Sequence, residues 1–211
     1  MTKLQSFNYK NTEIFYSNDH TGGGLTFGKD YIKLLKLYYT HRKFNHCLDW
    51  CAGPGFIGFY IYLNKLCTKL SLFEKNKLDI YYSQLTVAKA NLQNIDFINS
   101  DDIATIDEHL KFDLIVGNPP HFCIPIFQNK FISKRLTVDL NFDVHKNFFK
   151  NIKKNLTRDG VIILQESVFG SSPEIFEEDL NNSDLKITNV YDGLKKSTNH
   201  YQTYFIEITH K

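Results

Sequence analysis

The sequence places an asparagine and an imidazole beside two prolines, directly after a short apolar run. Residues 112–117 are largely apolar, as is typical of a buried strand, and Asn118-Pro119-Pro120-His121 follows them. Proline fixes its own φ and keeps the preceding residue out of the helical region. We therefore expect Asn118 to be held extended at the carboxyl end of a strand, with its amide open to a ligand. Alone, the tetrapeptide is equally compatible with an ordinary turn.

A second set of candidate residues surrounds three glycines after an earlier strand. Gly53, Gly55 and Gly58 form a Gly-x-Gly-x-x-Gly pattern whose backbone can approach a ligand closely. Glu74 ends the next expected strand, where a carboxylate accepts ribose hydroxyls, so a nicotinamide cofactor is one interpretation. Asp49 favours a different one. It puts a charge where dinucleotide folds keep the strand apolar, and it is placed to hold a ligand ammonium.

The elements that would position these residues alternate along the chain. Strands are expected over residues 46–50, 69–74, 94–99, 112–117 and 161–165, and helices over residues 28–39, 56–66, 77–94, 103–110 and 143–156. Two closing strands, 185–190 and 201–209, leave no room for a crossover helix. This order predicts an α/β fold with a parallel sheet, helices on both faces and an antiparallel addition at one edge. Ligands in such sheets bind at the carboxyl ends of the strands.

Length and composition limit the classes of function. The 211 residues suit one domain, or a domain with a small appendage. The net charge of +2 argues against a large nucleic-acid footprint. The four cysteines lack a disulfide-framework spacing, so we expect reduced thiols in a cytoplasmic protein, with Cys47 and Cys51 in the core rather than on a metal. No leader and no apolar run of membrane-spanning length is expected.

Together, these motifs resemble those of the class I S-adenosylmethionine-dependent methyltransferases. The chain is most similar to the branch with an Asn-Pro-Pro-aromatic motif after the fourth strand, which includes release-factor glutamine methyltransferases and adenine-N6 methyltransferases. The resemblance covers about residues 20–210. It implies a Rossmann-like methyltransferase fold with a seven-stranded, mostly parallel sheet and an antiparallel C-terminal strand pair. It also implies S-adenosyl-L-methionine as the cofactor and S-adenosyl-L-homocysteine as the product.

The resemblance also implies which residues bind the cofactor. Asp49, Gly53 and Gly55 would hold the methionine portion, and Glu74 the ribose hydroxyls. Asp101 would meet the adenine amino group, and Asp102 is an equally eligible partner. The full set of expected cofactor-binding residues is Asp49, Gly53, Gly55, Glu74, Asp101, Asp102, Asn118 and Phe27.

The N-terminal residues 1–27 are expected to form a separate hairpin and lid, ahead of a methyltransferase domain over residues 28–211. Aromatic residues flank a polar turn within residues 7–16, which predicts a short hairpin. The glycines at 22–24 make a flexible loop and a candidate cofactor lid, and Phe27 would pack near the cofactor.

The chemistry of the resemblance explains the Asn-Pro-Pro motif. An amide or aromatic amine nitrogen is a poor nucleophile because its lone pair is delocalised. If the Asn118 side-chain oxygen and the Pro119 carbonyl each accept one N–H, the nitrogen gains electron density and its lone pair points at the methyl group. The prolines make both acceptors rigid. A sulfonium is already a strong electrophile, so this chemistry does not demand a dedicated general base.

His121 departs from the family pattern, which has Tyr, Phe or Trp at this position. An imidazole can stack on or orient the acceptor, accept a proton, or serve a structural role with Phe122 as the platform. We expect Asn118, Pro119 and His121 to be catalytic, and Pro120, His121 and Phe122 to bind the substrate. Residues 122–142 would overhang it, with three basic residues in a solvated loop or near an acidic group: Lys130, Lys134 and Arg135.

The sequence therefore predicts an S-adenosylmethionine-dependent N-methyltransferase acting on a planar nitrogen. A protein side-chain amide and a small molecule rank level as acceptors, with an RNA adenine below both. The modest charge and the lack of a separate target-recognition domain disfavour duplex DNA, and no membrane partner is expected. Two alternatives remain, an NAD(P)-dependent oxidoreductase and a catalytically silent scaffold. The oligomeric state stays open.

Overall fold

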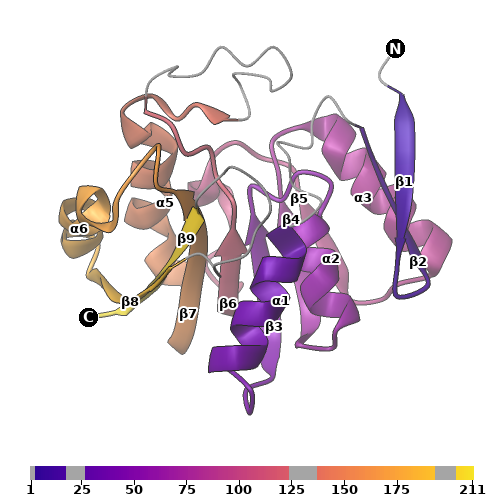
Figure 1. Ribbon diagram of the computed structural model, residues 1–211, viewed down its shortest axis with the longest axis horizontal. Helices are drawn as coiled ribbons and strands as arrows, with labels where there is room; N and C mark the ends of the chain where they lie inside the picture. Colours follow the sequence, from indigo (N-terminus) through magenta and orange to yellow (C-terminus); the bar gives the residue numbers. More distant parts are fainter. Residues whose placement is uncertain (1–2, 18–26, 124–136, 193–202) are drawn as a thin grey trace. The chain divides into compact units, whose positions relative to one another are not determined.

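The computed structural model describes residues 3–17, 27–123, 137–192 and 203–211 (Figure 1). The strands are β1 (Leu4–Tyr9), β2 (Thr12–Ser17), β3 (Phe44–Trp50), β4 (Cys67–Phe73), β5 (Ile95–Ile98), β6 (Phe112–Gly117), β7 (Leu156–Ser167), β8 (Leu185–Asp192) and β9 (Thr203–His210). The helices are α1 (Phe27–Tyr38), α2 (Phe56–Leu63), α3 (Lys77–Ala90), α5 (Asp143–Ile152) and α6 (Pro173–Asn182). Short 3₁₀ helices are η3 (Ile103–Thr105), η4 (Leu140–Phe142) and η5 (Lys153–Asn155).

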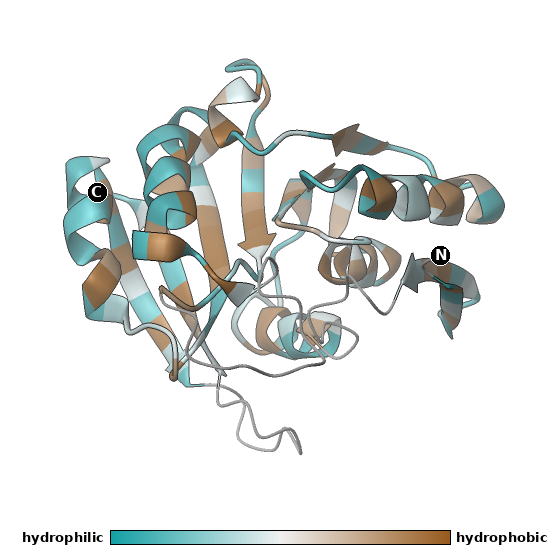
Figure 2. Cartoon of the chain, turned by 90° about the horizontal axis from the view of Figure 1, so that it is seen from above, coloured by the Kyte–Doolittle hydropathy of each residue, from teal (hydrophilic) through white to brown (hydrophobic). Residues whose placement is uncertain are grey.

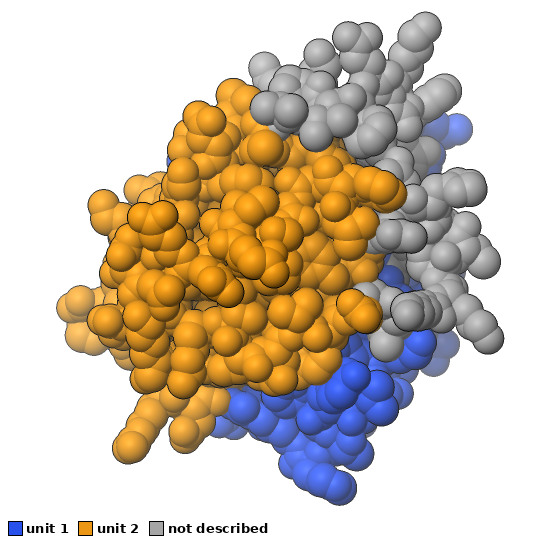
Figure 3. All heavy atoms as spheres, turned by 60° about the vertical axis from the view of Figure 1, so that its left-hand side comes forward, with its two compact units in different colours: residues 1–101 blue, residues 102–211 orange. Residues whose placement is uncertain are grey.

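The strands form a two-stranded sheet, β1-β2, and a seven-stranded sheet in the order β5-β4-β3-β6-β7-β9-β8. The pairs β3–β4, β4–β5 and β6–β7 are parallel, whereas β9 pairs antiparallel with both β7 and β8. The predicted α/β fold, mostly parallel with an antiparallel C-terminal pair, is confirmed. The chain divides into two compact units, residues 1–101 and 102–211, coloured blue and orange in Figure 3.

The first unit begins with the predicted hairpin. Lys10 and Asn11 have φ values of 47° and 63°, which the two central residues of a type I′ hairpin turn require. Tyr9 stacks on Tyr60 of α2 with ring centroids 3.8 Å apart. On β2, the Phe15 N–H donates to Thr86 Oγ1 of α3 at 3.0 Å. The hairpin is thus fastened to two helices of its own unit.

The second unit has its core between the strands and two helices. Helix α5 buries Phe148, Phe149 and Ile152 and leaves Lys146 and Lys150 exposed, so its amphipathic pattern is confirmed. The same division holds more widely in Figure 2, where the strands are largely brown and the helices carry both colours. None of the helices within the described ranges is long and apolar enough to cross a membrane.

Several boundaries differ from those expected. The helix predicted over 103–110 is only the 3₁₀ helix η3, and the helix predicted to reach 94 ends at Ala90, where Asn91 takes a left-handed conformation. Strand β7 begins at Leu156, ahead of the expected start at 161, and runs through Asp159-Gly160. Helix α6 was not predicted. Proline at its first turn was the available signal, but only Phe176 and Leu180 of this helix are buried.

The hairpin contact gives a first prediction. Replacing Thr86 by valine keeps the shape but leaves the Phe15 N–H buried without its acceptor, so we expect a loss of about 1–3 kcal/mol in the free energy of unfolding. Chemical denaturation measures it. Thr68→Val, at an exposed position of the same unit, is the control and should change the stability by less than about 0.5 kcal/mol. Equal effects of the two substitutions would contradict the assigned role of Thr86.

Candidate active site

Asp49 lies near the end of β3 and is fully buried. Its Oδ2 accepts the Gly58 N–H at 2.7 Å, whereas Oδ1 has no hydrogen-bond partner among the described residues. Burial raises the pKa of Asp49 to about 7; the bond from Gly58 opposes the shift, and the nearby charge of Glu74 adds to it. A buried carboxyl group with one unused oxygen suits a cationic ligand group, because a positive partner would offset the cost of burying its charge.

The turn after β3 adopts a backbone that glycine permits. Gly53 and Gly55 have φ values of +54° and +83°, in the left-handed region. A Cβ on Gly55 would lie 2.8 Å from the ring of Phe59, but a Cβ on Gly53 would meet nothing within 4 Å. Gly55 therefore permits close packing under α2, while Gly53 leaves the backbone open to a ligand.

Glu74 follows β4 and fixes this turn. Its Oε2 accepts the Gly53 N–H at 2.8 Å, and its Oε1 accepts the Asn76 N–H at 2.8 Å. Since a carboxylate oxygen has two acceptor positions, each can still accept a hydroxyl, as ribose binding requires. Burial raises the pKa of Asp79, in the first turn of α3, to about 8, and the charge of Glu74 adds to it. The raised pKa values of Asp49 and Asp79 show that burial disfavours the charged form of these carboxyl groups, a cost that a cationic ligand group would offset.

The remaining candidates for the cofactor differ in how they are engaged. Asp102 caps η3, where its Oδ1 accepts the Ala104 N–H at 2.9 Å and the Asn147 side-chain N–H at 3.0 Å. These bonds, Asn147 first, hold the pKa of Asp102 below its ordinary value. Asp101 is exposed after β5, and Phe27 is half-buried at the start of α1. The carboxylate of Asp102 is thus engaged in capping η3. The expected lid at 22–24 lies outside the described residues.

In the second unit, the Asn-Pro-Pro-His stretch directly follows β6, as predicted. The Asn118 oxygen Oδ1 is buried and has no hydrogen-bond partner within the described part of the chain. Pro119 is buried, and Pro120, His121 and Phe122 are partly buried. The Phe122 N–H donates to the carbonyl of residue 137 at 2.9 Å, and its own carbonyl accepts the Asp139 N–H at 2.8 Å. The motif thus holds a buried acceptor on an anchored backbone.

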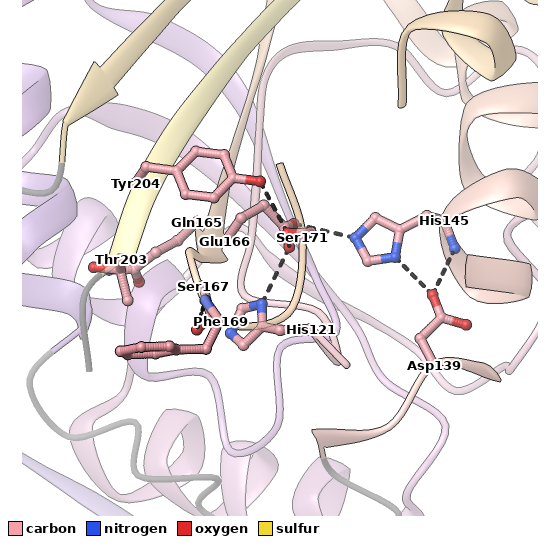
Figure 4. A network of polar contacts seen from close by, with 10 residues as sticks. All are labelled: His121, Asp139, His145, Gln165, Glu166, Ser167, Phe169, Ser171, Thr203 and Tyr204. Atoms are coloured by element: carbon pink, nitrogen blue, oxygen red, sulfur yellow. Dashed lines mark hydrogen bonds and ion pairs between the residues drawn. The ribbon is translucent and has the colours of Figure 1, made fainter. Parts of the chain in front are cut away.

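A chain of side chains runs from His121 into the core (Figure 4). His121 Nδ1 lies 3.2 Å from Glu166 Oε2, and Glu166 Oε1 lies 3.1 Å from His145 Nε2. His145 Nδ1 lies 2.6 Å from Asp139 Oδ2. Asp139, His145 and Glu166 are each buried, whereas 12% of the His121 side chain is exposed. His121 is therefore the outer end of a buried polar network.

The network holds a buried imidazolium between two carboxylates. Burial alone would lower the pKa of His145, but Glu166 and Asp139 outweigh it and raise that pKa to about 9. Burial would likewise raise the pKa of Glu166, but His145 and His121 outweigh it and lower that pKa to about 2. His145 also stacks on Phe176 of α6, with centroids 4.8 Å apart at 18°. Both rings of the network are thus fixed in orientation.

The sequence prediction identified His121 but missed Asp139, His145 and Glu166. One signal was present, because Glu166 ends the run that contains the apolar residues 161–164. A carboxylate at the end of a buried strand is also the pattern of Asp49. For His145 and Asp139 no such signal exists, since the Glu166 that their pair contacts is distant in the sequence.

The strand order and the closing antiparallel pair define the class I S-adenosylmethionine-dependent methyltransferases. Residues 32–191 match the family model of the methyltransferase small domain, and the chain belongs to this family. It is an S-adenosylmethionine-dependent methyltransferase, with S-adenosylmethionine as its cofactor. Among curated protein sequences, none matches the chain significantly. Family membership favours the methyltransferase interpretation over the nicotinamide one.

Solved structures share the fold at low sequence identity. An S-adenosylmethionine-dependent methyltransferase from Clostridium acetobutylicum ATCC 824 has a TM-score of 0.63 and 13% identity, over 87% of this chain and 90% of its own. The ribosomal protein L11 methylase from Lactobacillus delbrueckii subsp. bulgaricus has a TM-score of 0.59 and 16% identity, over 85% of this chain and 76% of its own. TYW2 of M. jannaschii in complex with AdoMet has a TM-score of 0.61 and 14% identity, over 100% of this chain and 88% of its own. At such identities the likeness shows the fold alone.

The buried state of Asp49 predicts a pH-dependent cofactor affinity. An ammonium group binds the ionised carboxyl, whose pKa is about 7 in the free protein, so binding displaces a proton below that pH. The affinity for S-adenosylhomocysteine should fall up to about tenfold per pH unit from pH ~7 to ~5.5. Calorimetry measures it. Asp49→Asn, whose amide oxygen can still accept the Gly58 N–H, should bind more weakly and with a flatter profile. The same slope in both proteins would refute the assignment.

The buried network predicts how stability depends on pH. Because the folded pKa of His145 is raised from 6.5 to about 9, its stabilisation is complete below 6.5 and lost as the pH rises through 9. We expect His145→Gln to cost about 3–5 kcal/mol at pH ~6.5, because it leaves two buried carboxylates without their cation. That difference should narrow toward pH ~9 in urea titrations. A constant difference would contradict a buried imidazolium. Asp49 and Asp79 titrate in both proteins and cancel.

Proposed function

We propose that the protein transfers the methyl group of S-adenosylmethionine to a planar amide or amine nitrogen of a protein side chain or a small molecule. One observation carries this proposal. Asn118 Oδ1 is a buried acceptor with no hydrogen-bond partner in the described part of the chain, directly before Pro119. A buried acceptor without a partner is costly, and an N–H of the substrate would satisfy it.

The residues present fit the cofactor. Asp49, with its unused buried oxygen, would hold the ammonium group, and the open backbone at Gly53 would lie along the methionine portion. Glu74 would accept the ribose hydroxyls, Asp101 the adenine amino group, and Phe27 would pack near the cofactor. When bound, S-adenosylmethionine supplies an electrophilic methyl group. The residues of this chain would hold the cofactor in place for the transfer.

Asn118 and Pro119 would activate the acceptor nitrogen by accepting its hydrogens. One N–H donates to Asn118 Oδ1 and one to the Pro119 carbonyl, which raises electron density on nitrogen and orients its lone pair. Proline restricts the backbone at both positions, so the two acceptors are preorganised and lose little freedom during the reaction. Such acceptors are worth most where water is excluded, and the burial of Oδ1 satisfies that condition.

Pro120, His121 and Phe122 would form the side of the site that contacts the planar acceptor. His121 and Phe122 meet edge-on with centroids 6.3 Å apart. A planar amide and an adenine both fit such a surface, so RNA is the alternative acceptor. The basic residues predicted to overhang it, Lys130 among them, lie outside the described residues. The four cysteines are free thiols, in line with a cytoplasmic protein.

The first test asks which molecule is methylated. The protein is incubated with labelled S-adenosylmethionine and separate protein, RNA and metabolite fractions of a host extract. Label on a nitrogen in the protein or metabolite fraction is expected. Label confined to RNA would favour the adenine alternative. No transfer to any fraction, with the cofactor bound, would indicate a silent scaffold.

The second test concerns the two acceptors at Asn118 and Pro119. Asn118→Ala removes one acceptor of the nitrogen hydrogens, so we expect methyl transfer to fall about 10²–10³-fold, as for the loss of one preorganised polar group. Binding of S-adenosylhomocysteine should fall far less than methyl transfer, because Asn118 is only one of the residues expected to contact the cofactor. Asn182→Ala, at an exposed position of α6, is the matched control. Full activity of Asn118→Ala would refute the mechanism.

A further inference from the structure

His121 is held in one orientation by contacts on two sides. Its Nδ1 faces Glu166 of β7, and the turn after β7 packs against its backbone, since a Cβ on Gly170 would lie only 2.2 Å from the His121 carbonyl oxygen. Ser171 of the same turn donates to Glu166 Oε2 at 3.3 Å and lies 2.9 Å from the Tyr204 hydroxyl. Because Ser171 donates its proton to Glu166, it accepts from Tyr204.

The partners of Glu166 determine where the protons of the network are. Glu166 has its pKa lowered to about 2, so it is a carboxylate that accepts from His121, Ser171 and His145. A carboxylate has no proton to give, so His121 must carry its proton on Nδ1. In the neutral imidazole this leaves a lone pair on Nε2. Free histidine carries no such constraint; here the fold imposes the tautomer.

Glu166 and the groups behind it are the charged neighbours of His121. Within the described part of the second unit, the groups that face it are Glu166 from β7 and, through Ser171, the Tyr204 hydroxyl from β9. Behind Glu166 lie His145 and Asp139. The carboxylate of Glu166 lies directly against His121 Nδ1, so a proton taken up on Nε2 has an anion on the opposite side of the ring.

We propose that His121 accepts the proton released by the methylated nitrogen and that Glu166 positions it for this role. This rests on the proposed function. The acceptor nitrogen forms its bond to the methyl carbon, and the sulfur–methyl bond breaks with its electron pair left on sulfur. One proton of the nitrogen then passes to His121 Nε2, directly or through one water, and the product is a neutral methylated amide or amine.

The network explains why this chain keeps an imidazole where the family it resembles has an aromatic ring. Tyrosine or phenylalanine at this position can stack but cannot take up a proton near neutral pH. Glu166 is already paired with His145 and Ser171, and a phenyl ring in place of His121 could not donate to its Oε2 as the imidazole N–H does. The imidazole and the buried carboxylate belong together.

The kinetic test compares His121→Phe and His121→Tyr with the wild type, at saturating S-adenosylmethionine and with the acceptor found in the extract. Both variants should lose about 100-fold in kcat, and the fall in kcat at acid pH that the wild type shows should be absent from them. Imidazole should restore activity to His121→Ala, increasingly as the pH rises. Variants as active as the wild type with an unchanged pH profile would overturn the proposal, since stacking alone would then suffice.

Glu166→Gln tests positioning. An amide can donate to Nδ1 as well as accept from it, so the tautomer is no longer imposed; kcat should fall about tenfold with its acid limb displaced, while Glu166→Asp should restore part of the rate. A purely structural role would change stability without moving the pH profile. If the profile stays in place, Glu166 does not position His121.

A measurement without any acceptor separates this inference from the proposed function. In ¹⁵N-histidine spectra of the full chain at pH ~8, His121 should be the Nδ1–H tautomer and His145 should remain doubly protonated. In Glu166→Gln, the preference of His121 for this tautomer and the double protonation of His145 should both be lost. Finding Nε2–H at His121 would overturn the inference even if methyl transfer is observed. Failure of wild-type methyl transfer, with the Nδ1–H tautomer present, would instead refute the proposed function.

Discussion

Buried carboxyl groups at the ends of apolar strands are the constraint on which both units depend. Burying such a charge is costly unless a positive or donating partner offsets it. In the second unit the partner of Glu166 is a side chain of the protein itself, the imidazolium of His145, which lies between Glu166 and Asp139. In the first unit Asp49 accepts one N–H, from Gly58, its Oδ1 has no hydrogen-bond partner among the described residues, and its pKa rises. The network around Glu166 is thus complete, whereas the site around Asp49 is suited to a cationic ligand.

The two solutions serve different purposes. The complete network of Asp139, His145 and Glu166 fixes the orientation of His121, because every proton in it has one acceptor. Burial of the Asp49 carboxylate costs free energy, and a bound ammonium group would offset this cost. Asn118, directly before Pro119, presents a buried oxygen that has no hydrogen-bond partner among the described residues.

The sequence predicted most of the fold because its signals are local. Residues 112–117 form β6 with the predicted bounds, and the hairpin turn lies at Lys10 and Asn11 as the polar residues indicated. Asn118 directly follows β6 as predicted, Asp49 lies next to the last residue of β3, and Glu74 comes directly after β4. Helix α6 was missed because only Phe176 and Leu180 mark its buried face, and β7 starts at Leu156 rather than 161, where Leu156 pairs with Phe112 of β6.

The sequence by itself determined the strand–helix order, the glycine turn, the carboxylates after the strands and the Asn-Pro-Pro acceptor, since each depends on neighbouring residues. It left three roles open for His121. Only the tertiary structure joined His121 to Glu166, 45 residues away, and Glu166 to His145 and Asp139. Proton positions depend on which groups are buried together, and the sequence does not state that. The fold therefore decided which nitrogen of His121 carries its proton.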